Sequence, residues 1–419
     1  MANGGGNNQW YLKQQPPLQN ELDRVTDAAI QKIIDRKITP EIEGRGRFAE
    51  RAKLKLSRAT SDDQKSIEAL FAKQPIPFSG LTLLYDRTPD FFSLLRARGH
   101  AHAAIAARLG ESSDLWGLGS ISLREGYFNH APAHIAYLGD LRMLLSRNTA
   151  RVWRQLYSRL LQDIAKEIGV ASFLTAIVGE NKAALRSLVT RQNSEFIYEP
   201  LGRLRLLAVL GRWAVLSNGR RRLENDRVLV GDAAEIEFLR FYSERAPALR
   251  HGWVEVPSVG VPIALKNRRG ETKVVARLVS PDQLKRLTVQ DVDWKTRALF
   301  QSLRLTGVQP VAPGSSVTTT YLSWVCYGQD LTAVERRHAL IELIDVCLEH
   351  PLLKAMGIVN WMLLVPDTVG LSMRELGGRL HYSTPVELFE VRTEEALPRS
   401  QLTTGLHDVH DIGFEMALL

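Results

Sequence analysis

The chain has 419 residues, 45% of them hydrophobic and 24% charged. This composition excludes collagen-like, low-complexity and wholly disordered proteins. It carries 54 Lys and Arg against 46 Asp and Glu, a net charge of +8, which is compatible with nucleic acid, an acidic membrane surface or a phosphate-rich ligand. Two cysteines are too few for a disulfide framework, and no apolar run approaches the roughly 18 residues that a membrane helix needs. With no secretory signal at the start, we expect a cytoplasmic protein.

The first 51 residues are predicted to form an arm. Residues 1–9 are rich in Gly and Asn and form a flexible lead. Between residues 18 and 38 apolar side chains recur at helical spacing, and Pro40 follows them. We therefore expect a helix that ends before the proline.

Residues 53–210 alternate strand and helix patterns and are predicted to form the first folded unit. Gly139 lies inside one predicted strand, where a lone glycine often marks a β-bulge. The long helix carries one apolar stripe, Gly169 is well placed to end it, and Asn181 is a natural N-cap for the next helix. The predicted order is strand 53–57, helices 60–73 (capped by Ser61 or Asp62) and 91–98, strands 101–109, 116–125 and 135–145, helix 149–168, strand 171–178, helix 181–190 and strand 201–210.

The second half of the chain repeats this order. Asn218 and Gly219 precede three arginines, Arg220–Arg222, and we interpret this run as a solvated linker at a domain boundary. Two copies of one supersecondary plan indicate a duplicated domain, and the alternation of strands and helices indicates a sheet with helices on both faces. The predicted elements are strand 321–327, helix 331–348, strand 358–365, helix 372–380 and strand 385–392. The predicted division is an arm at 1–51, a first domain at 52–217, a second at 218–395 and a tail at 396–419.

The element order within residues 53–210 resembles the GNAT superfamily of N-acetyltransferases. The segment YLGDLRM at 137–143 is similar to the strand that enters the acyl-CoA loop of that family, and VGENKAAL at 178–185 is similar to its asparagine motif. The second half resembles the divergent C-terminal copy of tandem-domain members. The resemblance implies an α/β fold of two tandem GNAT-like domains, each a mixed, mostly antiparallel sheet flanked by helices.

The resemblance also implies an acyl-CoA-dependent N-acyltransferase. Acetyl-CoA or another acyl-CoA would be the cofactor, and a small amine or amino acid derivative the small-molecule acceptor. In the family, a bulged strand splays from its neighbour to bind the pantetheine, and the next helix receives the pyrophosphate at its N-terminus. Asp140 is then the candidate base. The positions matching the cofactor site are Leu141, Arg142, Met143, Arg147, Asn148, Thr149, Ala150, Arg151 and Asn181.

The loop before the long helix departs from the family pattern. The family has glycines there, whereas RNTARVW at 147–153 has none, and Trp153 occupies a position where a small residue is expected. Side chains and an indole obstruct close approach of a phosphate to the backbone. Leu188 replaces the tyrosine often found seven residues after the motif asparagine. These departures favour an alternative function, a non-catalytic GNAT-like scaffold or binding protein with a degenerate cofactor loop.

The candidate residues also have structural explanations, which the sequence leaves open. Asp140 is either a base or a carboxylate held by a nearby arginine, and Asn181 is either a ligand contact or a helix cap. Arg147 and Arg151 either pair with a phosphate or are solvated at the helix start. No histidine pair has a third ligand at suitable spacing, so no metal site is expected. Scattered arginines without interleaved aromatics argue against nucleic acid, and a homodimer stays open.

Overall fold

A computed structural model of the chain describes residues 21–38, 42–43, 54–78, 80–110, 112–128, 131–144, 147–190, 196–210, 228–245, 251–253, 260–304, 311–356, 362–372, 374–376 and 381–393.

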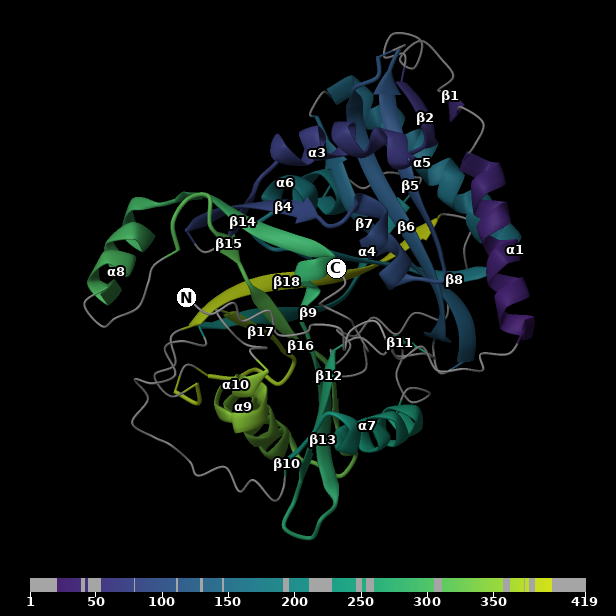
Figure 1. The fold of residues 1–419 in the computed structure, drawn as a ribbon. Coiled ribbons are helices and arrows are strands. Elements are labelled where there is room, and N and C mark those ends of the chain that lie inside the picture. The colour runs from purple at the N-terminus through teal and green to yellow at the C-terminus, as the bar shows by residue number, and fades with distance from the viewer. Residues whose placement is uncertain are drawn as a thin grey trace.

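One large sheet runs through the whole molecule (Figure 1) and has fourteen strands in the described chain. Its order is β1-β2-β5-β6-β7-β8-β18-β9-β17-β16-β13-β12-β10, and β11 pairs with β6 beside this path. Neighbouring strands are antiparallel except in the pairs β7–β8 and β16–β17. The strands of the first half are β1 (Ile42–Glu43), β2 (Leu54–Arg58), β5 (Ala101–Leu109), β6 (Leu115–Phe128), β7 (Ala131–Met143), β8 (Val170–Val178) and β9 (Phe196–Leu210). Those of the second half are β10 (Val228–Val230), β11 (His251–Trp253), β12 (Val261–Lys266), β13 (Thr272–Val279), β16 (Thr319–Tyr327), β17 (Met362–Asp367) and β18 (His381–Thr393).

The two halves exchange their last strands at the centre of this sheet. The strand β18 lies between β8 and β9, and β9 lies between β18 and β17. Each half therefore completes its sheet with the final strand of the other half. The predicted boundary at residues 217 and 218 lies outside the described residues and stays a prediction.

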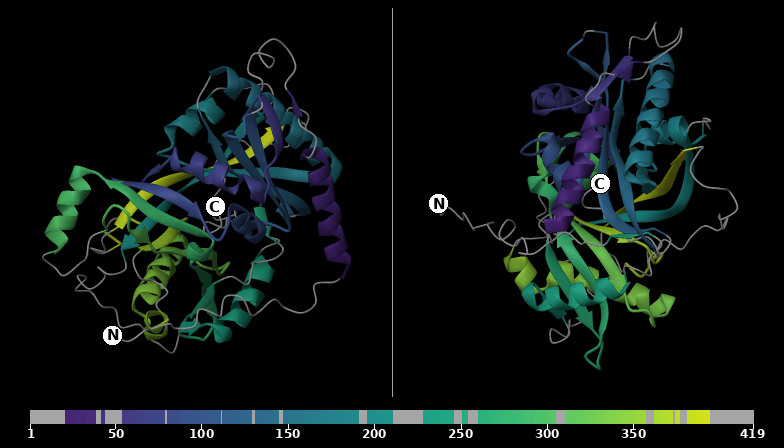
Figure 2. Two further views of the ribbon diagram at one scale, coloured as in Figure 1. Left: turned by 45° about the horizontal axis from the view of Figure 1, so that its top comes forward. Right: turned by 90° about the vertical axis from the view of Figure 1, so that its right-hand side faces the viewer.

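Helices cover both faces of the sheet (Figure 2). One face carries α1 (Glu21–Ile38) and α5 (Arg147–Ile168) in the first half and α9 (Ala333–Glu349) in the second. The opposite face carries α3 (Gln64–Ala72), α4 (Phe91–Arg98) and α7 (Asp232–Arg245). The remaining helices are α6 (Lys182–Ala184), α8 (Trp294–Arg304) and α10 (Pro351–Ala355).

A small second sheet packs on the face that carries α3, α4 and α7, and it joins the two halves. It consists of β3 (Ile76–Phe78), β4 (Leu81–Arg87), β14 (Lys285–Val292) and β15 (Ser316–Val317), in the order β15-β14-β4-β3. The central pair is β4 from the first half with β14 from the second, in register from Arg87 opposite Lys285 to Leu81 opposite Val292.

Most predicted elements are confirmed, with corrections at their ends. The helix over 60–73 begins with a 3₁₀ turn at Ser61–Asp63, and its capping residue is Thr60, whose reciprocal partner is Asp63, rather than Ser61 or Asp62. Residues 374–376 form a turn where a helix over 372–380 was predicted. Gly169 adopts a φ of +77° and ends α5 as predicted. The three-arginine linker lies outside the described residues.

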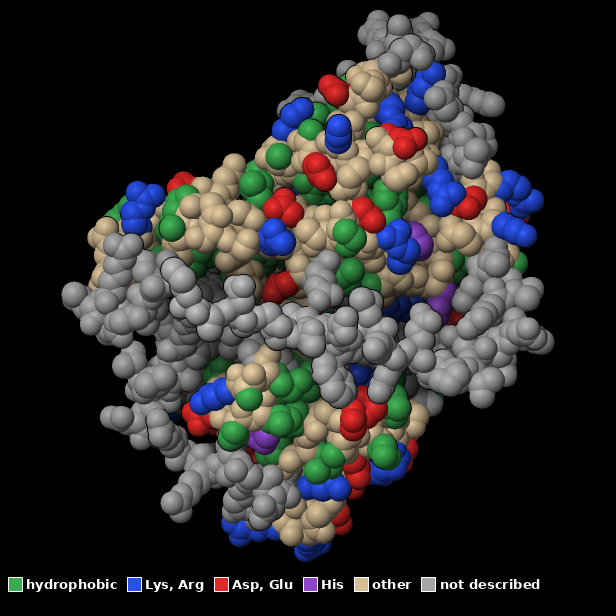
Figure 3. Space-filling view, in the orientation of Figure 1, with side chains coloured by type: hydrophobic (Ala, Val, Ile, Leu, Met, Phe, Trp, Pro, Cys, Tyr) green, Lys and Arg blue, Asp and Glu red, His purple; other side chains and the backbone are tan. Residues whose placement is uncertain are grey.

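Charged side chains are dispersed over the face shown in Figure 3. Lys and Arg side chains alternate there with Asp and Glu instead of forming one continuous basic patch. No helix in the described ranges is long and apolar enough to cross a membrane. In the same ranges, no group of three His, Cys, Asp or Glu side chains is placed to hold a metal ion.

Candidate functional site

The parallel strands β7 and β8 separate part of the way along their length. Their register runs from His134 opposite Val170 to Tyr137 opposite Leu174 and then stops. Beyond this point β7 continues in pairing with β6, and β8 continues in pairing with β18. One side chain bridges the opening, because Thr175 Oγ1 donates to the Leu138 carbonyl at 2.9 Å. The separated strands leave backbone groups of β7 on the side that faces β8.

A β-bulge lies on β7 beside this splay. Leu118 pairs with Arg142 and Ser120 pairs with Gly139, so two residues of β7 oppose Gly119 alone. One of the two is Asp140, whose φ is 51°. Left-handed backbone is uncommon outside glycine, and aspartate is among the residues that adopt it most readily. The bulge that the lone glycine predicted is confirmed, one residue further along the chain.

The second half has the same arrangement at corresponding positions. The parallel register of β16 and β17 ends at Tyr321 opposite Leu364. The register of β13 and β16 shifts between Val275 and Arg277, and Trp324 has a φ of 56°. In both halves the left-handed residue therefore lies three positions after the last parallel pair. The splay and bulge belong to the duplicated plan, while the side chains at the bulge differ.

Asp140 is the centre of a buried ion cluster. Its side chain is 4% exposed and accepts hydrogen bonds from Arg98 Nη1 at 2.5 Å and from Ser120 Oγ at 3.0 Å. It also accepts a hydrogen bond from Arg87 Nη2. Arg87 ends β4, Arg98 ends α4 and Ser120 lies on β6. The bulge therefore aims the carboxylate at the face that carries α4 and the small sheet.

The arginines make this carboxylate unusually acidic. Burial of Asp140 would raise its pKa, but the charges and hydrogen bonds of Arg87 and Arg98 hold the pKa well below its ordinary value. Such a carboxylate is a weak proton acceptor at neutral pH. The geometry thus favours the arginine-held carboxylate over the general base, and the catalytic assignment of Asp140 remains a prediction.

The neighbours of Asp140 on β7 are held from both faces. Leu141 and Met143 are half-buried against the core beneath α5. Arg142 lies on the other face, where Nη1 donates to the Gln74 carbonyl at 3.1 Å and the guanidinium lies 5.0 Å from the centre of the Phe71 ring. Gln74 Nε2 in turn donates to the Met143 carbonyl at 2.5 Å. These contacts fix the end of β7 next to the splay.

The helix α5 begins directly after β7, at Arg147. Its first turn contains Asn148 and Thr149, and the side chains of these three residues are outside the described part of the structure. Ala150 packs against the core, and the side chain of Arg151 is exposed. The helix start therefore lies close along the chain to the splay, as the resemblance implied.

Trp153 packs beneath α5 and not at its first turn. Its side chain is 1% exposed and stacks on Tyr157, with ring centroids 5.0 Å apart. A Cβ atom placed on Gly119 would lie 3.4 Å from the indole. The glycine of β6 thus makes room for Trp153, whose indole packs in the core beneath α5. Whether the segment 147–153 obstructs a phosphate stays a prediction.

The segment after β8 contains the motif asparagine. Asn181 caps α6 by accepting a hydrogen bond from the Ala184 N–H at 3.1 Å, which confirms the predicted N-cap. A second role of Asn181, as a contact to a bound ligand, remains a prediction. Leu188 lies in the π-helical turn Leu185–Thr190 that follows.

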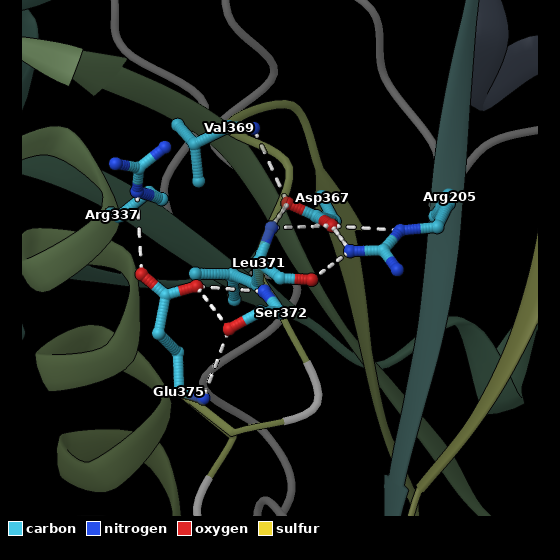
Figure 4. Close-up of polar contacts among 7 residues, drawn as sticks. All are labelled: Arg205, Arg337, Asp367, Val369, Leu371, Ser372 and Glu375. Atoms are coloured by element: carbon cyan, nitrogen blue, oxygen red, sulfur yellow. Dashed lines mark hydrogen bonds and ion pairs between the residues drawn. The ribbon is translucent and has the colours of Figure 1, made fainter. Parts of the chain in front are cut away.

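The corresponding turn of the second half is stabilised by an ion pair between the halves (Figure 4). Asp367, at the end of β17, is fully buried and accepts from the Leu371 N–H at 3.0 Å and from Arg205 Nε at 3.0 Å. Arg205 belongs to β9. Ser372 and Glu375 bond reciprocally, with the Ser372 N–H donating to Glu375 Oε2 at 2.7 Å. These polar groups satisfy one another, which favours a structural role for this turn.

Tyr137, the first residue of the segment that resembles the acyl-CoA strand, lies at the splay. It is the last residue of β7 paired with β8, and its hydroxyl has a hydrogen bond with the backbone of Ala176. The Arg98 guanidinium lies 5.5 Å from its ring centre. Burial raises the pKa of Tyr137 to about 12, so the phenol stays protonated at neutral pH. Only the strand register reveals this position at the splay.

A splayed parallel pair, a bulged strand and a helix that starts beside them define the GNAT fold, and the chain has this fold in two tandem halves. Solved structures of Saccharomyces cerevisiae N-myristoyltransferase with bound myristoyl-CoA are similar to it. One has a TM-score of 0.50 at 10% identity, covering 87% of this chain and 90% of that one. A second, also with inhibitors, has a TM-score of 0.50 at 11% identity, covering 90% and 92%. At this identity the likeness shows the fold alone. No protein-family model matches the chain, and no curated protein matches it in sequence.

Proposed function

We propose that the chain is an acyl-CoA-dependent N-acyltransferase that acts on a small amine or amino acid derivative. The observation that carries this proposal is the splay between β7 and β8, which leaves backbone groups of β7 open next to the start of α5. Such an opening is suited to a ligand that presents amides to a strand and phosphates to a helix N-terminus.

The residues around the splay fit an acyl-CoA. The backbone of Leu141–Met143 would hold the pantetheine amides, and the first turn of α5, with Arg147 and Arg151, would hold the phosphates. The burial of Trp153 supports this fit, because its indole packs into the core beneath the helix. When bound, the acyl-CoA supplies a thioester carbonyl, an electrophile for an amine.

Among the described residues, Tyr137 is placed to handle a proton at the splay. Its hydroxyl is protonated at neutral pH and lies beside the backbone of β8. A phenol at this point can donate a proton to a departing thiolate, a role for which the sequence alone offered no residue. Asp140, with its low pKa, is better suited to orienting Arg87 and Arg98 than to accepting a proton.

The fold does not specify the length of the acyl chain on the CoA. The similar solved structures hold myristoyl-CoA, so long-chain donors belong in the test beside acetyl-CoA. The alternative function, a non-catalytic GNAT-like binding protein, is favoured by one observation. No glycine lies in the segment 147–153, where a phosphate would approach the backbone.

Thermal unfolding with acetyl-CoA and with myristoyl-CoA tests the proposal, followed by release of free thiol when amines are added. A ligand that binds the folded chain raises its Tm by mass action. Arg147→Ala and Arg151→Ala should weaken binding, whereas Arg159→Ala, which removes an exposed arginine further along the same helix, should not. No shift in Tm at millimolar acyl-CoA would refute the enzyme proposal. A shift without thiol release would support the binding protein.

A further inference from the structure

Three arginines and one carboxylate meet at the β7 bulge, and we call them the arginine cluster: Arg87, Arg98, Arg142 and Asp140. They come from the neighbouring elements β4 and α4 and from β7, about 40 residues further along the chain. The side chains of Arg87, Arg98 and Asp140 are 6%, 4% and 4% exposed. Such burial is rare for arginine unless its charge is paired.

The positive charge of this cluster exceeds its negative charge. Both oxygens of Asp140 are occupied by Arg87, Arg98 and Ser120. Arg142 has only a backbone carbonyl and the Phe71 ring as partners among the contacts described above, and burial lowers its pKa. The arginine cluster itself therefore contains three guanidiniums and one carboxylate.

Arg87 also keeps unused hydrogen-bond donors. Its Nε and Nη1 atoms are buried and have no acceptor among the described residues. The rings of Phe71 and Tyr85 lie 5.9 Å from its guanidinium carbon and accept no conventional hydrogen bond. Buried donors are normally satisfied, and arginine is the residue that most often pairs with carboxylate or phosphate. The arginine cluster thus has an excess of positive charge and unused hydrogen-bond donors, which suit one more anionic group.

The position of the cluster relates this anion to acyl transfer. It lies on the face with α4 and the small sheet, opposite the face that carries α5. Tyr85, Tyr137 and Arg142 lie around the cluster and are half-buried. An acyl-CoA bound on the α5 side of the splay would therefore meet an acyl acceptor that approaches from the side of the arginine cluster.

We propose that the arginine cluster binds a carboxylate of the acyl acceptor, with Arg87 as the main anchor. This inference rests on the proposed function and narrows it: the acceptor is an amino acid or another amine that carries a carboxylate, and a neutral amine is a poor substrate. In the transfer, the amine nitrogen forms the new amide bond to the acyl carbon and the carbon–sulfur bond of the thioester breaks. The amine loses one proton, and the departing CoA thiolate gains one to become the free thiol.

The test compares a panel of free amino acids with their carboxamides, glycine against glycinamide and leucine against leucinamide first, by thiol release from acetyl-CoA and myristoyl-CoA. We expect a kcat/KM at least 10-fold higher for the acids. Arg87→Met should raise KM for the acids about 10- to 100-fold, as expected for a lost hydrogen bond to a charged group, and leave the amides unchanged. Phosphoethanolamine, included as a third probe, distinguishes a phosphate from a carboxylate. Its preference over both other classes would overturn the carboxylate assignment.

Two further variants keep the test decisive. If Arg87→Met does not fold, Arg142→Met, at a half-buried position, replaces it, and Arg96→Met, an exposed arginine of α4, is the matched control. Equal use of acids and amides, or a preference that survives in both cluster variants, would overturn the inference while the acyltransferase stands. If no acceptor releases thiol, the proposed function fails. Calorimetry of the amino acids alone then decides the inference, which is overturned if none binds and supported if binding is lost in the cluster variants.

Discussion

Replacing Asp140 by asparagine separates a structural carboxylate from a catalytic one. The substitution keeps the size of the side chain and removes the charge that pairs with Arg87 and Arg98. Two buried guanidiniums then lose their counter-charge, and asparagine cannot accept all three hydrogen bonds that the carboxylate accepts. We therefore expect a large loss of stability.

The size of this loss follows from the burial of the pair. Removing one partner of a buried ion pair costs about 3–5 kcal/mol. One sheet joins both halves, so we treat the 419-residue chain as one cooperative unit. Unfolding entropy is about 2 cal/mol/K per residue, or about 0.9 kcal/mol/K for this chain, so a loss of about 4 kcal/mol lowers Tm by about 4–5 °C.

The assay is thermal and urea unfolding at pH 7 and at pH 3. Because the folded-state pKa of Asp140 lies below its unfolded value, its contribution is present above about pH 4 and is lost as the pH falls toward the folded pKa. The difference between the wild type and Asp140→Asn should therefore shrink at pH 3. Asp86→Asn, on the exposed neighbour of Arg87 in β4, should change stability by less than about 0.5 kcal/mol.

A variant that unfolds like the wild type at pH 7 but releases no thiol would refute this reasoning. It would show that the charge of Asp140 acts on the substrate and not on the arginines, as expected for a general base. A variant with lower Tm and residual acyl transfer would support the structural carboxylate.

Three other substitutions test the geometry of the splay. Tyr137→Phe should lower the rate of thiol release about 100-fold without weakening acyl-CoA binding, measured by single-turnover kinetics and thermal shift; an unchanged rate would remove this phenol from the mechanism. Trp153→Ala should destabilise the chain by about 3–5 kcal/mol in urea unfolding, because its indole fills the core beneath α5; a loss below 1 kcal/mol would contradict its burial. Gly139→Ala places a Cβ 2.9 Å from the Tyr137 ring and 3.0 Å from Arg98 Nη1, so the free energy of unfolding should fall and the KM for the acyl acceptor should rise. Wild-type values for both would contradict the packing at the bulge.

The elements with strong local signals were predictable, and those defined by long-range pairing were not. The stripe of α5, the cap at Asn181 and the bulge near Gly139 follow from neighbouring residues, and each is confirmed. The pair β4–β14 and the exchange of β9 with β18 join segments about 200 residues apart, which no local pattern encodes. The same limit applies to the site. Asp140 was a candidate from its strand, but its partner Arg87 comes from β4, a segment without a predicted element.

The two halves share the splay and the bulge but differ in the charge at the bulge, which favours the first half as the place of the proposed chemistry. At the bulge of the second half, Trp324 is buried and packs edge-on against Tyr242, with ring centroids 6.0 Å apart. Arg277, which occupies the position of Ser120, is paired with Glu235 at 2.5 Å. An aromatic side chain at the bulge, with an arginine paired to Glu235, favours a structural role for this position. The first half instead concentrates buried positive charge beside the opening between β7 and β8. The net charge of the chain therefore says little about the proposed ligand. The excess of positive charge at the arginine cluster is more informative, because it lies at the bulge.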